Sequence, residues 1–166
     1  MRINVQRYRD ELSRIPGNPP LEFSHKHAGL TQWLLDNCIP EDISAFLLQN
    51  TPASLVSFDG LGGIFSPDDI IYHNNGTPQF KSDQLIQIGS AINGDPIVID
   101  YGISIGITGY VDHETLWSGD MISARQIFIP VANTIDDYLH ALLTDDEFPI
   151  DYYMAVDSKY NITRNT

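Results

Sequence analysis

The chain has 166 residues and a formal net charge of −13, and 42% of its residues are hydrophobic. This length and composition predict one globular domain over residues 1–166, and no apolar run approaches the ~20 residues that a membrane-spanning helix needs. After residue 26, four basic residues face nineteen acidic ones, so the chain lacks the cationic surface that direct nucleic-acid binding requires.

The first third of the chain is predicted to be mainly helical. Apolar residues recur at helical spacing over 5–15, before a proline-rich stretch ends that helix. A second helix is expected over 30–37, and Pro40 followed by two acidic residues predicts the start of a third. Residues 51–84 contain many glycines, prolines and asparagines, so short strands and turns are expected there, with one helical turn at 66–72.

A β-hairpin is predicted in the middle of the chain, with strands over 85–92 and 97–101. Asn93 and Gly94 lie between these strands, and this pair favours a type I′ turn, in which both central residues have positive φ. Asp95 completes the predicted turn.

The register of this hairpin is predicted from Pro96. Because Pro96 has no N–H to donate, it is expected opposite Ala91 at a non-hydrogen-bonded position. The same register places Ile88 opposite Ile99, and it keeps the isoleucines of both strands on one face.

Further alternation of isoleucines with small polar residues over 103–107 predicts another strand, and 110–114 is expected to extend the sheet. Thr134 followed by Asp137 resembles a capping box and opens a predicted helix through Leu143. The predicted class is therefore α+β, with a central mixed or mainly antiparallel sheet of at least four strands, flanked by amino-terminal and carboxyl-terminal helices.

Residues 102–106 read GISIG and match the nucleophile-elbow pattern G-x-S-x-G of serine hydrolases, with Ser104 in the place of the nucleophile. An elbow needs a helix after the serine, but 107–111 is β-branched, aromatic and broken by glycine, which argues against a helix. His113 and His140 follow in the chain, so a small serine hydrolase using Ser104 remains the alternative function.

Metal and cofactor sites are not predicted. Asp112, His113 and Glu114 are metal-ligand types, but in a strand His113 would point to the face opposite the two carboxylates. No zinc-binding cysteine pattern or phosphate-binding loop accompanies them. A single cysteine and a start without an apolar segment predict a cytoplasmic protein with no membrane contact.

The stretch 126–158 contains seven acidic residues, interleaved with aromatic ones, and no lysine or arginine. Aromatic side chains beside unpaired carboxylates suit a cationic protein partner and would speed its capture. The residues assigned to this partner-binding surface are Asp136, Asp137, Asp145, Asp146, Glu147 and Tyr152.

The order of these features resembles the SUKH superfamily, specifically its Smi/Knr branch, over roughly residues 30–145. Members commonly carry a strand of the form I-x-I-G/A, a Gly-Asp turn, a strand ending in Asp, a strand of the form V-x-x-x-D/H-E and a closing helix with an F/Y-L pair. The matching pieces here are IPEDI at 39–43, LIQIG at 85–89, NGDPIVID at 93–100, VDHE at 111–114 and NTIDDYL at 133–139.

The resemblance implies a single α+β domain without catalytic activity. Bacterial members are typically immunity proteins that bind and neutralise a cognate toxin, often a nuclease, and fungal relatives regulate cell-wall synthesis through protein contacts. The resemblance also implies that Gly94, Asp95 and Asp100 are structural. With Asn93 and Pro96, which the turn chemistry assigns, the residues Asn93, Gly94, Asp95 and Pro96 are expected to form a structural turn.

Three functions are therefore expected in order. The first is an immunity protein that blocks a toxin with a basic surface, because a nuclease must present such a surface to phosphates and an acidic protein can occupy it. The second is the hydrolase using Ser104. The third is a scaffold or regulatory protein without a toxin partner.

Overall fold

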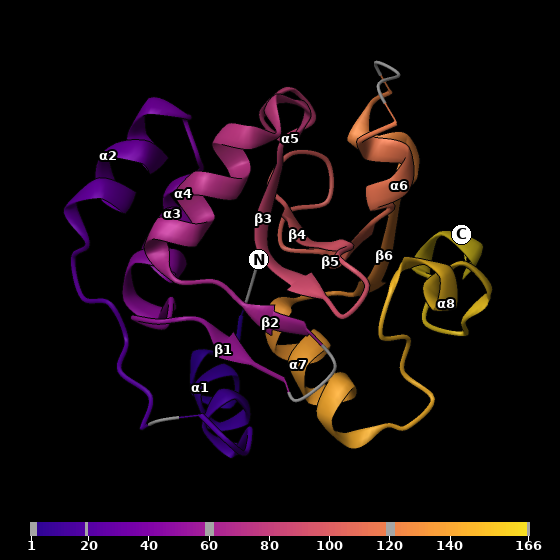
Figure 1. The fold of residues 1–166 in the computed structure, drawn as a ribbon, viewed down its shortest axis with the longest axis horizontal. Coiled ribbons are helices and arrows are strands. Elements are labelled where there is room, and N and C mark those ends of the chain that lie inside the picture. The colour runs from indigo at the N-terminus through magenta and orange to yellow at the C-terminus, as the bar shows by residue number, and fades with distance from the viewer. Residues whose placement is uncertain (1–2, 19, 59–61, 119–121, 166) are drawn as a thin grey trace.

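The computed structural model describes residues 3–18, 20–58, 62–118 and 122–165, and its centre is an antiparallel sheet (Figure 1). Each strand pairs with the next one along the chain, and all pairings among the described residues are antiparallel, which confirms the predicted α+β class. The strands are β1 (Val56–Ser57), β2 (Gly62–Ile64), β3 (Leu85–Ala91), β4 (Pro96–Asp100), β5 (Thr108–Val111) and β6 (Phe128–Ala132).

One face of the sheet packs against a large apolar cluster to which five of the longer helices contribute, together with Ala155 near the carboxyl terminus. In β4, Ile97 and Ile99 point into this cluster, while Val98 between them points to the opposite face. Amphipathic helices supply the other side, as Tyr8 and Leu12 of the first helix illustrate. These helices are α1 (Val5–Arg14), α2 (Ala28–Asp36), α3 (Glu41–Asn50), α4 (Pro67–Gly76) and α7 (Ile135–Thr144).

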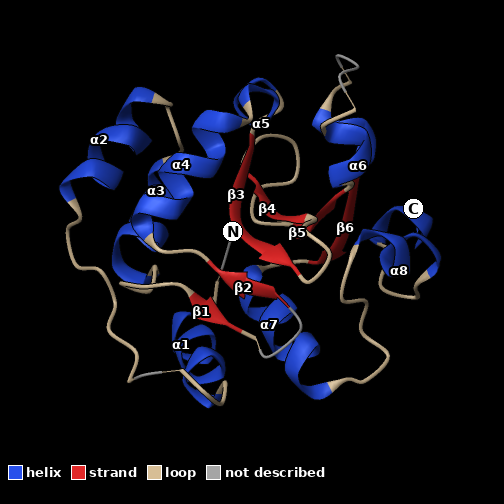
Figure 2. Ribbon diagram, viewed as in Figure 1, coloured by secondary structure: helices blue, strands red, loops and turns tan. Residues whose placement is uncertain are grey.

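The opposite face is covered by a smaller cluster from shorter helices, to which Phe80, Leu116 and Ala124 belong. Because both faces are covered, every residue of β4 is buried. The short helices are α5 (Pro78–Ser82), α6 (His113–Leu116) and the 3-10 helix η1 (Ala124–Ile127). The carboxyl-terminal segment, which contacts β6, forms α8 (Tyr152–Asp157) and the 3-10 helix η2 (Ile162–Asn165) (Figure 2).

The three helices predicted in the first third of the chain are confirmed as α1, α2 and α3. The single helical turn predicted at 66–72 is instead the ten-residue helix α4, which begins with a capping box between Ser66 and Asp69. Asn74 continues this helix because its side chain bonds the backbone N and O of Gln87 in β3. The tertiary contact of Asn74 thus outweighs the low helix propensity of asparagine. No helix in the described ranges is long and apolar enough to cross a membrane.

The hairpin of β3 and β4 is confirmed, but its turn type differs from the prediction. Gly94 N donates to Ala91 O (3.1 Å), Ala91 N donates to Asp95 O (2.8 Å), and in this loop only Gly94 has positive φ. The connection is therefore a three-residue loop with a glycine bulge, and not a two-residue type I′ turn. The predicted register is also wrong, since Pro96 pairs with Ser90 and not with Ala91.

A second irregularity, at Ile88, shifts the pairing again, so Ile99 lies opposite Ile86 and not opposite Ile88. Before the bulge the slip is two residues, and it leaves the isoleucines of both strands on their predicted face because side chains alternate with a period of two. Apolar alternation therefore could not detect the error. The bulge lies at the position where Asn74 bonds Gln87, next to the point where β2 stops pairing with β3.

Two strand predictions after the hairpin are wrong. Residues 102–106 form a loop that leaves Ile103 77% exposed, because the Asp100 carboxylate accepts the backbone N–H groups of the next residues and turns the chain. The stretch 110–114 is not continuous strand either. Asp112 caps the start of α6, so β5 ends just before it.

Candidate partner-binding surface

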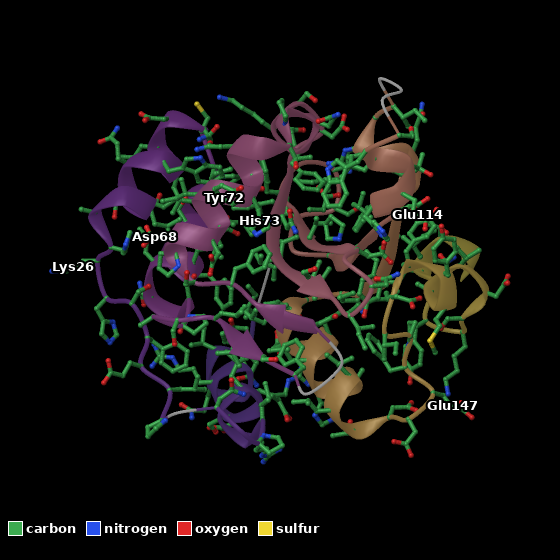
Figure 3. The ribbon with its side chains drawn as sticks, in the orientation of Figure 1. Lys26, Asp68, Tyr72, His73, Glu114 and Glu147 are labelled. Atoms are coloured by element: carbon green, nitrogen blue, oxygen red, sulfur yellow. The ribbon has the colours of Figure 1, made fainter. Side chains whose placement is uncertain are left out.

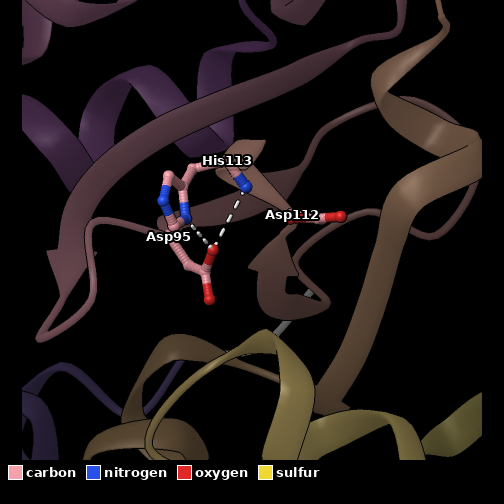
Figure 4. Close-up of side chains that lie close together, drawn as sticks. All are labelled: Asp95, Asp112 and His113. Atoms are coloured by element: carbon pink, nitrogen blue, oxygen red, sulfur yellow. Dashed lines mark hydrogen bonds and ion pairs between the residues drawn. The ribbon is translucent and has the colours of Figure 1, made fainter. Parts of the chain in front are cut away.

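Asp95 joins three segments that are far apart in the sequence. Its side chain is completely buried, and its carboxylate accepts hydrogen bonds from Asn93 Nδ2 (2.7 Å), from His113 N (3.1 Å) and Nδ1 (2.6 Å), and from Tyr152 N (2.9 Å). Figure 4 shows the two contacts with His113. The hairpin loop, the start of α6 and the start of α8 are therefore attached to one carboxylate, and these residues are called the Asp95 cluster below.

The local sequence explains how each donor reaches Asp95. Gly94, with φ +98°, turns the chain so that the Asp95 side chain points back under the loop. The N-caps Asp112 and Asp151 begin α6 and α8, which leaves the early N–H groups of both helices without partners inside the helix. Asp95 accepts one such N–H group from each helix.

The electrostatics of the Asp95 cluster favour the ionised carboxylate. Burial alone would raise the pKa of Asp95, but hydrogen bonds from His113, the Tyr152 backbone and Asn93 outweigh it, and the pKa lies below its usual value. The carboxylate is thus a fixed negative charge beneath the surface.

The carboxylates of Asp95 and Asp112 lie close to the imidazole of His113, and one atom of each lies within 4.8 Å of the others. These are metal-ligand types, yet hydrogen bonds already occupy their oxygens. Asp112 accepts from Glu114 N (3.1 Å) and from the Thr115 hydroxyl, and Asp95 accepts the four donors above. A cation would have to displace these donors, so the chemistry of this group is that of a helix cap and a structural cross-link. The predicted strand geometry of 112–114 is wrong, because these residues begin a helix.

The predicted partner-binding residues do not form one surface. Asp136 and Asp137 lie at the start of α7, and both bond Arg7 of α1; the Asp136 side chain is 2% exposed. The predicted capping box is half formed, since the Thr134 hydroxyl accepts Asp137 N but the Asp137 carboxylate turns to Arg7. Asp136 is therefore a buried anchor between two helices and is removed from the predicted surface.

The other predicted acidic residues follow the end of α7, about 15 Å along the helix from its start. Asp145 and Glu147 both pair with Lys159, and Asp145 also accepts the Tyr160 hydroxyl, which lowers the Asp145 pKa. Asp146 is exposed and forms no ion pair among the described residues. Lys159 therefore neutralises part of the charge of this region. The sequence analysis did not predict this pairing, because Lys159 lies just outside the acidic stretch 126–158.

Tyr152, the remaining predicted contact, lies elsewhere. It is half-buried at the start of α8, and its backbone N–H donates to Asp95. Sequence reasoning assigned only Tyr152 of this segment to the surface, and it missed the exposure of Tyr153 and Met154 on α8 and of Trp117 at the end of α6. The signal in the sequence was a tryptophan, Trp117, within a polar stretch. Its exposure could not be predicted, because the way α6 and α8 pack together is not visible in the sequence.

Ser104 does not occupy a nucleophile elbow. It lies in the loop between β4 and β5, and the chain continues into a strand where an elbow requires a helix. Its backbone N–H donates to Asp100, and Arg125 pairs with the same carboxylate at 2.8 and 2.9 Å. Among the described residues, no histidine forms a hydrogen bond with Ser104, so the arrangement of a catalytic triad is not present there.

Comparison with known proteins gave no significant match to a family model, to a curated protein or to a solved structure.

Proposed function

We propose that the chain is a non-catalytic protein-binding domain that acts in the cytoplasm as an immunity protein, binding a cognate toxin through the toxin's basic surface. The observation that carries this proposal is the excess of acidic charge, 22 acidic against nine basic residues. Such an excess attracts a basic partner and accelerates its association.

Among the described residues, ion pairs within the chain involve four of the nine lysine and arginine side chains, and they leave the net charge unchanged. Arg7, Arg14, Arg125 and Lys159 each pair with carboxylates of the same chain. These four cations are therefore paired within the chain, and the net charge of −13 remains available to attract a basic partner. A nuclease toxin has the complementary surface, since it binds phosphates.

The resemblance to the SUKH superfamily supports the same function. The family implies a single α+β domain, and the observed fold is of that class. The single cysteine, which is exposed and forms no disulfide, is in keeping with a reducing compartment.

Co-expression tests the proposal. The carboxyl-terminal module of the protein encoded by the neighbouring open reading frame is expected to arrest growth when expressed alone, and co-expression of this chain is expected to restore growth. The purified pair should form a one-to-one complex that weakens as salt rises. If the module arrests growth equally in the presence of this chain, the immunity function is wrong.

The hydrolase alternative is tested separately. Ser104→Ala is expected to leave any turnover of a generic aryl ester unchanged, because the elbow geometry around Ser104 is missing. Turnover by the wild-type chain that disappears in Ser104→Ala would instead support the hydrolase.

A further inference from the structure

Five large apolar side chains are exposed around the Asp95 cluster. They come from four segments: α4, the hairpin loop, α6 with its C-cap, and α8. The exposed side chains are Tyr72 (76%), Trp117 (57%), Ile92 (54%), Tyr153 (52%) and Met154 (48%). Together with the carboxylates of Glu114 and Asp151, they are called the Trp117 face below.

A groove and two contacts link parts of this face. Tyr72 and Trp117 line one groove of about 420 Å³. The Trp117 ring lies 5.8 Å from the ring of His113, and the Tyr153 hydroxyl donates to Glu114 Oε2 at 2.8 Å. In Figure 3, Tyr72 lies at α4 and Glu114 at α6, on opposite sides of the strands in this view, and Glu147 lies apart from both.

The Asp95 cluster holds three of these segments in fixed relative positions. Ile92 precedes Asn93, Trp117 follows α6, and Tyr153 follows Tyr152, so each exposed residue is close in sequence to a residue bonded to Asp95. A surface that is already ordered in the free protein loses little conformational freedom on binding. The face is therefore built as a preorganised platform.

The charge of the Trp117 face is negative and unneutralised. Among the described residues, neither Glu114 nor Asp151 pairs with a lysine or arginine. The hydrogen bond to Glu114, followed by desolvation and the charge of Asp112, raises the pKa of Tyr153 to about 12. The surface at 145–147 differs in this respect, because Lys159 offsets it.

We propose that the Trp117 face, and not the acidic stretch at 145–147, is the surface that docks the basic protein partner. Exposed aromatic rings beside uncompensated carboxylates suit arginine and lysine, whose charge a carboxylate pairs and whose side chains stack on a ring. The groove between Tyr72 and Trp117 is a place for one such side chain. This inference rests on the proposed function, because it names the surface through which the chain would bind a toxin.

The test uses lysozyme as a small basic probe protein, so it does not require the natural partner. ¹⁵N-labelled wild-type chain is titrated with unlabelled lysozyme at low salt, and backbone amide shifts are mapped. The largest shift changes are expected at 72–77, 92–94, 113–117 and 152–156. Three outcomes would overturn the proposal. They are largest shift changes at 145–147, shift changes spread evenly over the surface, and no binding at low salt.

Two charge-matched double variants sharpen the result. Glu114→Gln/Asp151→Asn removes two charges from the Trp117 face, keeps an acceptor for Tyr153, and keeps a capping side chain on α8. It is expected to weaken lysozyme binding about three- to tenfold. Asp146→Asn/Glu147→Gln changes the net charge equally, and its affinity should stay within about twofold of wild type. Equal losses of lysozyme affinity in the two double variants would contradict the assignment of the Trp117 face as the docking surface.

Trp117→Ala tests the apolar part of the face, with thermal melting to verify folding. It should weaken binding without changing the net charge, and unchanged affinity would contradict a docking role for Trp117. The neighbouring toxin module separates the two proposals. If the module binds but shifts 145–147, the face is wrong and the function stands; if the module does not bind while lysozyme maps to the face, the function is wrong and the face stands.

Discussion

Asp95 carries a charge in a place where water cannot reach it. An isolated buried carboxylate costs several kcal/mol of desolvation, and this cost is recovered only when its oxygens are fully hydrogen-bonded. The donors from Asn93, His113 and Tyr152 meet that condition. They also convert one residue into the link between the hairpin loop and two helices, so the shape of the Trp117 face depends on it.

Removal of this carboxylate should be costly. Asp95→Ala is expected to lower the free energy of unfolding by about 3 kcal/mol, because it leaves buried donors without an acceptor. Asp95→Asn, which retains one acceptor oxygen, should lose less. Urea denaturation followed by circular dichroism measures both, and a loss below about 1 kcal/mol in the alanine variant would contradict the central role of Asp95.

Asp100 is a second buried carboxylate with an assigned role. Burial alone would raise its pKa, but the Arg125 guanidinium and the backbone N–H groups of Gly102 and Ser104 lower it below the usual value of 3.8. Its folded pKa is thus depressed. The stability it contributes is present above pH 3.8, its unfolded value, and is lost as the pH falls through the folded pKa.

The lowered pKa of Asp100 predicts how stability changes with pH. Asp100→Asn should be destabilised relative to wild type at neutral pH, and the difference between the two should shrink as the pH falls below about 4. The urea unfolding free energy at pH 7, 4 and 3 measures it. A difference that stays constant or grows in acid would mean that the Asp100 pKa is not depressed in the folded protein.

At the scale of elements, asparagine side chains complete the hydrogen bonding of strand positions that no neighbouring strand covers, one exposed in β1 and one buried in β3. The amide of Asn18 bonds both N and O of Ser57 in the edge strand β1, and Asn74 does the same for Gln87 in β3. An open strand edge is a site for unwanted pairing with another chain. The two asparagines act as single-residue substitutes for a neighbouring strand.

The loop between β3 and β4 depends on one glycine. Gly94→Ala is expected to destabilise the fold by about 1 kcal/mol or more, because φ +98° is strained for a residue with a Cβ atom. Gly76→Ala is the matched control, since Gly76 has no positive φ and a Cβ there would meet open space. Thermal melting compares the two, and equal melting temperatures would contradict the requirement for glycine at position 94.

At the scale of the whole molecule, an excess of negative charge opposes the folded state through self-repulsion. Ion pairs such as Arg7 with Asp136 work in the other direction, but the net charge of −13 shows that repulsions outnumber them. The acidic surface that favours a basic partner therefore lowers stability when the partner is absent. A bound partner should relieve that repulsion.

Salt should relieve part of the same repulsion. Raising sodium chloride from about 20 mM to about 200 mM shortens the screening length, and the melting temperature is expected to rise by about 3 °C. Calorimetry at neutral pH measures the shift. A fall in melting temperature with added salt would show that attractive ion pairs dominate over the net charge.

Local patterns in the sequence were sufficient for much of the fold. Helical periodicity predicted α1, α2, α3 and α7, and the apolar alternation around Asn93 and Gly94 predicted the hairpin and the faces of its strands. These features depend on neighbours within a few residues, and such neighbours are visible in a sequence. The sequence predicted a mixed or mainly antiparallel sheet, and the structure shows antiparallel pairing at every strand contact among the described residues.

Only the tertiary structure decided the register and the site. The bulge at Ile88 depends on Asn74, and the loop after Asp100 depends on Arg125, which lies 25 residues further on. The candidate surface differs from the predicted one for the same reason. Asp136 is paired with Arg7 and buried, while Asp95 and Tyr152, 57 residues apart in the sequence, are hydrogen-bonded. The sequence by itself determined the acidic charge and the class of fold, because both are sums of local properties. Which charges stay exposed is a property of long-range pairs, and only folding selects those pairs.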